Sequence, residues 1–194
     1  PGDILFISNG VGDSARYRTE NVAEVLRMRG FTASVTVQDN PFLVSYAHDF
    51  SVFIFHRVLF TEKVQKFIEH IKEHQKTIIF FFFFLVYDPV FLKDMDYYAK
   101  MNTWEKKLYE HGLSGEILAD PFVEVATTTT SFLADKLSEK GKKVFIVKNT
   151  LSKKDMADAA AALQKVKKDP TLVRIAYFSG TPSHNKDFAT ITPV

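Results

Sequence analysis

The chain has 194 residues, of which 46% are hydrophobic and 25% charged, with a formal net charge of +2. This is the composition of a globular protein, and the nearly balanced charge gives no indication of a nucleic-acid partner. The absence of cysteine excludes disulfides and thiolate metal sites and fits a reducing compartment, so we expect a cytoplasmic protein.

Apolar, strand-like runs alternate with helical patterns along the chain. In the first half the expected order is strand 3–8, helix 17–29, strand 32–37, a short helical turn at 42–48, strand 52–56, a helix that Thr61 caps, and a strand from Thr77. In the second half it is helix 92–110, strand 122–127, helix 131–140, strand 143–149, a helix from Ser152 to just before Pro170, and a strand at 174–180. This alternation predicts an α/β fold with a doubly wound, mostly parallel, Rossmann-like sheet ordered around the first strand. The longest apolar run falls short of the roughly 18 residues of a membrane span.

Two helices carry clear start signals. Thr61 is a residue type that caps helix N-termini, and it is followed by apolar residues spaced at the helical period: Val64, Phe67, Ile68 and Ile71. Ser152, with an acidic residue three positions later, resembles a capping box.

Ligands of parallel sheets bind outside the carboxyl ends of the strands, which directs attention to the loops there. The loop SNGVGDSARYR (8–18) contains two glycines, which allow close approach of the backbone to a ligand, and two arginines that could pair with an anion. Its spacing is not that of a dinucleotide fingerprint. A tight turn with surface arginines remains the alternative interpretation.

Three other strand ends carry polar residues. His56 and Arg57 follow VFIF, and a histidine there can act as a base or hydrogen-bond a sugar. Asn149 follows VFIVK, and SGTPSHNKD (179–187) offers glycine, threonine and lysine to a phosphate. Each also has a purely structural interpretation, as a strand-edge histidine, a turn residue or an ordinary loop. The histidines show no metal-binding spacing.

Five segments of the sequence occur in a characteristic order. They are DILFISNGVGDSARYR, VFIFHRV with the TEKVQKFIEHIKEHQKTIIF that follows, EVATTTTSFLADKL, VFIVKNTLS and RIAYFSGTPSHNKDF. In that order they resemble a glycosyltransferase of the GT-B type, family 4. The resemblance covers nearly the whole chain. It implies an N-terminal, acceptor-side domain at 1–170 and the start of a donor-binding domain at 171–194, whose remainder would lie beyond Val194.

The resemblance implies transfer of a sugar from a nucleotide sugar to a saccharide or other hydroxyl acceptor, with retained anomeric configuration. No metal or other cofactor is implied, and a peripheral membrane contact is compatible with it. His56 is the expected catalytic residue. The expected substrate- and donor-binding residues are Asn9, Gly10, Gly12, Arg16, Arg18, Arg57, Asp88, Asn149, Gly180, Thr181 and Lys186.

Five consecutive phenylalanines, Phe80 to Phe84, depart from the family pattern. Relatives usually place a short aspartate-rich loop after the fourth strand, and Phe81 to Phe84 stand at those positions. We therefore expect a replaced polar loop and little transferase activity. The alternative function is a non-catalytic α/β binding or scaffold module. A flavodoxin-like or response-regulator-like domain is disfavoured, because the first loop supplies neither a Ser/Thr-rich phosphate loop nor an acidic pocket.

Overall fold

The structure, a computed structural model, describes residues 2–81, 98–103, 106, 115–165, 171 and 173. Six strands form one all-parallel sheet in the order β2-β1-β3-β4-β5-β6. The strands are β1 (Gly2–Ser8), β2 (Ala33–Val37), β3 (Phe50–His56), β4 (Thr77–Phe81), β5 (Val125–Thr128) and β6 (Lys143–Ile146). The predicted Rossmann-like α/β fold is therefore confirmed, with β1 inside the sheet between β2 and β3. Its first five strands follow the order of flavodoxin-like folds, but strand order does not fix function.

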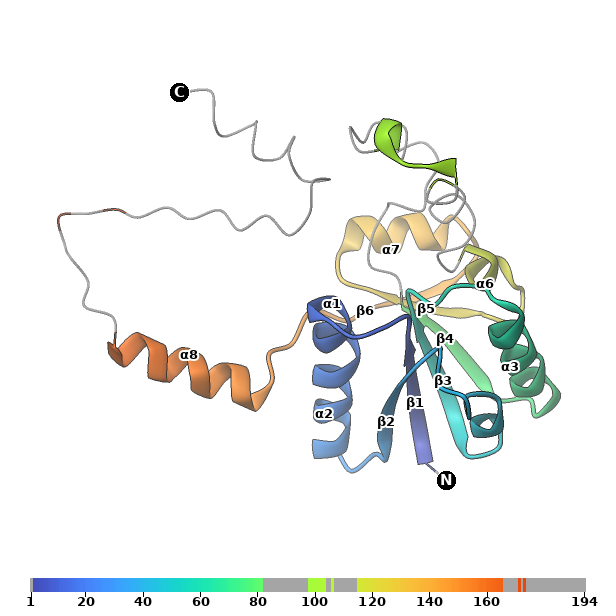
Figure 1. The fold of residues 1–194 in the computed structure, drawn as a ribbon, viewed down its shortest axis with the longest axis horizontal. Helices are drawn as coiled ribbons and strands as arrows, with labels where there is room; N and C mark the ends of the chain where they lie inside the picture. The colour runs from blue at the N-terminus through green and yellow to red at the C-terminus, as the bar shows by residue number, and fades with distance from the viewer. Residues whose placement is uncertain are drawn as a thin grey trace.

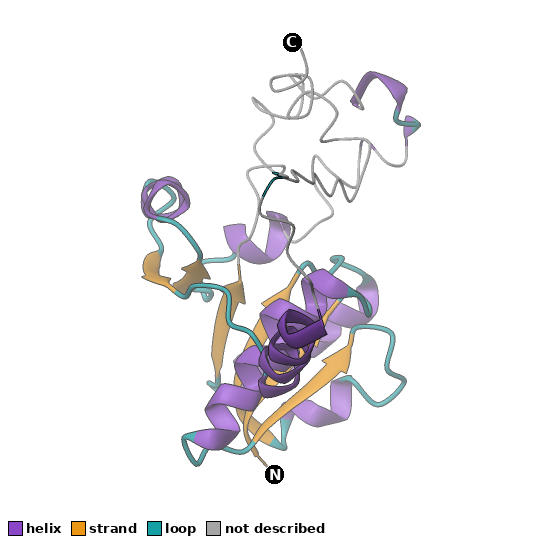
Figure 2. Ribbon diagram, turned by 90° about the vertical axis from the view of Figure 1, so that its left-hand side faces the viewer, coloured by secondary structure: helices purple, strands orange, loops and turns teal. Residues whose placement is uncertain are grey.

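Helices pack on both faces of this sheet (Figures 1 and 2). The described helical segments are α1 (Asp13–Ala15), η1 (Arg16–Glu20), α2 (Asn21–Met28), η2 (Val44–Ala47), α3 (Glu62–Glu73), η4 (Tyr98–Lys100), α6 (Gly115–Ala119), α7 (Ser131–Ser138) and α8 (Lys153–Lys165). The side chains of α2 join the smaller core cluster, and those of α3, α6 and α7 join the larger one. The sheet thus has a hydrophobic cluster on each of its two faces.

Strand β4 shows why the central strands are apolar over most of their length. Neighbouring residues of a strand point to opposite faces. Accordingly, Phe80 belongs to the larger cluster and Phe81 to the smaller one, and both are buried. Phe81 is therefore a strand residue, paired in register with His56 and Thr127. The expectation of a replaced loop beginning at Phe81 is wrong at that position, and Phe82 to Phe84 lie outside the described residues.

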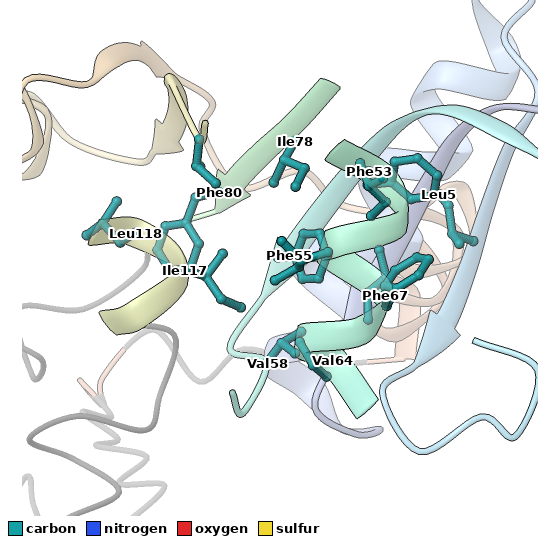
Figure 3. Packing of buried hydrophobic residues seen from close by; sticks show 14 of the residues in the cluster. Leu5, Phe53, Phe55, Val58, Val64, Phe67, Ile78, Phe80, Ile117 and Leu118 are labelled. Atoms are coloured by element: carbon teal, nitrogen blue, oxygen red, sulfur yellow. The ribbon is translucent and has the colours of Figure 1, made fainter. Parts of the chain in front are cut away.

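The larger cluster lies between the sheet and α3 (Figure 3). Phe55 of β3 packs against Phe67 of α3 with ring centroids 6.0 Å apart, and Phe53 meets the same ring edge-on at 5.3 Å. Thr61 caps α3 as predicted, because its hydroxyl accepts a hydrogen bond from the Val64 amide at 3.3 Å. The helical stripe and the cap therefore act together to place α3 on the sheet.

Several boundaries differ from the sequence prediction. The first helical region begins at α1, earlier than residue 17, and passes through a π-helical stretch before α2. The short helix α6 was not predicted. Most of the expected helix 92–110 and the expected strand 174–180 lie outside the described residues.

Helix α8 extends away from the sheet beyond α2 (Figure 1), and apart from Asp155 all its residues are exposed. The predicted capping box is present: the Asp155 amide donates to the Ser152 hydroxyl at 3.0 Å, and the Ser152 amide donates to the Asp155 carboxylate at 3.1 Å. Asp155 also pairs with Arg16 at 2.5 Å, so the first turn of α8 is tied to the first helical region. None of the described helices is both long and apolar enough to cross a membrane.

We expect Phe80→Ala to lower the free energy of unfolding by about 3–5 kcal/mol, because it leaves a cavity in the larger cluster. Phe145→Ala on β6 is the matched control, since that ring is 49% exposed, and it should cost less than about 1 kcal/mol. Urea denaturation measures both changes. Equal losses in the two variants would contradict the packing described for β4.

Candidate functional site

The carboxyl ends of β1 and β3 lie side by side at the point where the sheet changes direction. From β1 the chain continues to β2 on one side, whereas β3 flanks β1 on the other side. The pairing register sets Ser8 beside His56, the last residues of the two strands. In open parallel sheets, ligands bind at such a switch point.

The loop after β1 is shaped by its glycines. Gly12 has φ +135°, a conformation that residues with a side chain rarely adopt. The Ser8 hydroxyl donates to the Gly10 carbonyl at 2.6 Å, and the Arg16 amide donates to the Gly12 carbonyl at 2.8 Å, which begins the helix. A Cβ atom added at Gly10 or Gly12 would meet nothing within 4 Å. The loop therefore presents bare backbone to an open space.

A pocket of about 160 Å³ lies between this loop and the end of β3. It is lined by Ser8, Asn9, Gly10, Val11, Gly12, Ser14, Ala15, His56 and Arg57. His56 is buried, with 2% of its surface exposed, and its Nε2 lies 3.2 Å from the Ser14 hydroxyl. Its Nδ1 is buried and makes no hydrogen bond with the described part of the chain. The structure thus brings together four of the predicted loop and strand-end residues with His56 at one pocket.

Burial, together with the smaller effect of the positive charges of Arg57 and Arg18, lowers the pKa of His56 to about 3. The imidazole is therefore neutral at physiological pH, with one nitrogen donating and the other accepting. A neutral imidazole with so low a pKa is a weak base, but it can hydrogen-bond a hydroxyl group in either direction.

Arg18 occupies a different place from the one expected of a ligand-binding arginine. It is 1% exposed, does not line the His56 pocket, and carries its guanidinium 5.1 Å from the centre of the Phe81 ring. Its Nη1 donates to the Val147 carbonyl at 3.4 Å. Burial lowers its pKa to about 10. The Phe81 ring also meets the His56 ring at 5.8 Å, so Arg18 and Phe81 form the inner wall behind His56.

Arg16 lines a second, larger pocket on the other side of the glycine loop. Arg16 and His56 therefore lie at the same sheet edge, in adjoining pockets. Asn149 is exposed and lines neither pocket, although the neighbouring Thr150 carbonyl accepts a hydrogen bond from Asn21 at 2.8 Å. Four predicted site residues lie outside the described residues: Asp88, Gly180, Thr181 and Lys186.

Arg57 adopts a left-handed backbone conformation, with φ 54°. A non-glycine residue in this region costs about 1–2 kcal/mol, and such strain often marks functional sites. Gln75, just after α3, shares the conformation, with φ 51°, but lies at a helix end, where left-handed residues are common. Arg57 lines the pocket beside His56.

Sequence reasoning missed several residues of this region. Ser14 stands in the polar loop after the first strand, but it was not predicted as a site residue. Its contact with His56 arises only because the fold brings the two strands together. Thr127 and Thr128 at the end of β5 have buried hydroxyls without a hydrogen-bond partner among the described residues. Glu20 and Thr36 line the larger pocket. This pocket forms because the fold sets β2 next to the glycine loop, and the sequence does not show that these two segments are neighbours.

No protein-family model matches this chain, and no curated protein sequence matches it either. Within the described ranges, no three histidine, aspartate or glutamate side chains gather in a way that could hold a metal ion.

The low pKa of His56 predicts acid sensitivity of the fold. Below about pH 6.5 the unfolded chain binds a proton at this histidine whereas the folded chain does not, so the free energy of unfolding falls as the pH drops towards 3. At pH 5 this one group accounts for a loss of about 2 kcal/mol relative to pH 8. Urea denaturation at both pH values measures the loss, and His56→Gln should reduce it. A loss as large in His56→Gln as in the parent chain would show that His56 is not its source.

Replacing Arg57 tests its electrostatic effect directly. Arg57→Gly removes a positive charge beside His56 and relieves the left-handed strain, so the pKa of His56 should rise. Gln75→Gly is the matched control for the backbone change, and it should leave the pKa of His56 unchanged. NMR titration of the imidazole measures both variants. An equal shift in the two variants would contradict the role given to the Arg57 charge.

Proposed function

We propose that this chain is the acceptor-side domain of a sugar transferase similar to GT-B glycosyltransferases of family 4. The observation that carries the proposal is the pocket at the β1–β3 switch point, which joins the bare backbone of the glycine loop to a buried, neutral histidine. This pocket lies at the place in the fold where the family resemblance puts the acceptor. The order of sequence segments supports the same family.

In this proposal His56 orients a hydroxyl group of the acceptor or of the transferred sugar. Its Nε2 already meets the Ser14 hydroxyl, and its Nδ1 makes no hydrogen bond with the described residues. A buried polar atom without a partner gains from a ligand that supplies one. Arg57 adds a positive charge at the pocket, which suits the diphosphate of a nucleotide sugar.

Catalysis would rest on positioning and on stabilisation of the leaving diphosphate, with a nucleotide sugar as co-substrate and without a metal. The diphosphate contacts are assigned by the resemblance to Gly180, Thr181 and Lys186. The pKa of His56 agrees with a positioning role better than with proton abstraction, because a base with a pKa of about 3 accepts a proton poorly at neutral pH.

Phe81 changes the interpretation of the polyphenylalanine segment. Because Phe81 is buried in β4 beneath His56, an aspartate at this position would place a carboxylate in the hydrophobic cluster. The proposal that phenylalanines replace an acidic loop is therefore confined to Phe82, Phe83 and Phe84.

The weak basicity of His56 also favours the second candidate function, a binding module without catalysis. A neutral imidazole and bare loop amides can hold a hydroxylated ligand without any reaction. The two functions differ in turnover: a binding module takes up ligand but leaves a nucleotide sugar intact.

The test is sugar transfer from a panel of nucleotide sugars by the chain together with whatever the gene encodes beyond Val194. Because the phenylalanines at 82–84 are expected to leave little activity, we expect only slow transfer to a hydroxyl acceptor, and a further tenfold to hundredfold loss, about 1.4–2.7 kcal/mol, in His56→Ala. His70→Ala is the matched control, since His70 lies half-buried on α3, lines neither pocket, and has a ring nitrogen within hydrogen-bond distance of the Lys66 carbonyl. Binding of an acceptor without consumption of any nucleotide sugar would favour the binding module.

A further inference from the structure

The larger pocket adjoins the His56 pocket across the glycine loop and has a volume of about 600 Å³. It is lined by Ser8, Gly10, Val11, Gly12, Ala15, Arg16, Thr19, Glu20, Val35, Thr36 and Val37. Five of these residues also line the His56 pocket: Ser8, Gly10, Val11, Gly12 and Ala15. A single molecule that crosses the loop could therefore occupy both pockets.

The two pockets differ in chemistry. The lining beside His56 includes the polar residues Ser8, Asn9, Ser14 and Arg57. In the larger pocket the side chains of Val35 and Val37 from β2 and Ala15 from α1 make an aliphatic wall, and Val11 at the tip of the loop is 94% exposed. An exposed valine held between two glycines is available to cover an apolar ligand.

The charged residues of the larger pocket do not favour an anion. The Arg16 guanidinium is paired with Asp155 at 2.5 Å and lies 4.3 Å from the centre of the Tyr17 ring. Glu20 is exposed and brings a negative charge to the pocket. The volume and the aliphatic wall suit a neutral molecule of the size that such pockets usually hold.

We propose that the larger pocket binds the apolar part of an amphiphilic acceptor, a neutral alkyl- or aryl-bearing molecule whose hydroxylated end enters the His56 pocket. The proposal rests on the proposed function, because it names the class of acceptor that the same site takes. It predicts discrimination against free sugars, which lack the apolar part, because the aliphatic wall gains only from burial of apolar surface.

Two probes that differ only in their apolar part test this proposal: octyl β-glucoside, kept below its critical micelle concentration, and methyl β-glucoside. Isothermal titration of the 194-residue chain should give at least about tenfold tighter binding of the octyl compound. In NMR spectra, the amides of Val35 and Val37 should shift with the octyl compound and not with the methyl compound. This second measurement needs no variant to fold.

Val37→Phe fills the larger pocket and should weaken octyl glucoside binding about tenfold, while leaving methyl glucoside binding unchanged. Val25→Phe is the matched control, because Val25 lies 38% exposed on α2 and lines neither pocket. Equal affinities for the two glucosides, or shifts spread over the whole surface, would overturn the proposal. If the chain prefers the octyl compound but no sugar transfer is observed, the proposal for the larger pocket stands and the proposed transferase function fails. Failure of one proposal can therefore be distinguished from failure of the other.

Discussion

The structure depends on one constraint: the central strands of a parallel sheet must bury both of their faces. The second halves of β1 and β3 are buried throughout, and in β4 Phe80 and Phe81 fill clusters on opposite faces. Polar side chains in β1 and β3 stand near the strand ends, Asp3 and Ser51 near the amino ends and Ser8 and His56 at the carboxyl ends.

Much of the fold follows from local signals in the sequence. Thr61 and the stripe of Val64, Phe67, Ile68 and Ile71 define α3, and the Ser152–Asp155 box defines the start of α8, because caps and amphipathic stripes act within a few residues. The position of His56 at a strand end was equally predictable. Its contact with Ser14, the burial of Arg18 against Phe81 and the larger pocket beside β2 were not, because each joins segments that only the fold brings together.

The surroundings of His56 explain why its imidazole is a weak base. The ring is buried, with the centre of the Phe81 ring 5.8 Å away, and Arg57 and Arg18 each add a positive charge nearby. All three disfavour the imidazolium ion. His56 is thereby kept as an uncharged hydrogen-bonding group at neutral pH.

The packing of β4 has a consequence for how this strand finds its alignment. Alternation normally fixes strand register, because a shift by one residue exchanges the inward and outward side chains. Phe80 and Phe81 carry identical rings into the two clusters, so at these positions a shifted strand presents the same side chains as the native one. Alignment must then be enforced by Thr77, which is exposed at the start of β4, by Ile78, and by the neighbouring strands. Within β4, Phe80 and Phe81 are therefore the positions at which side-chain alternation distinguishes the native register least.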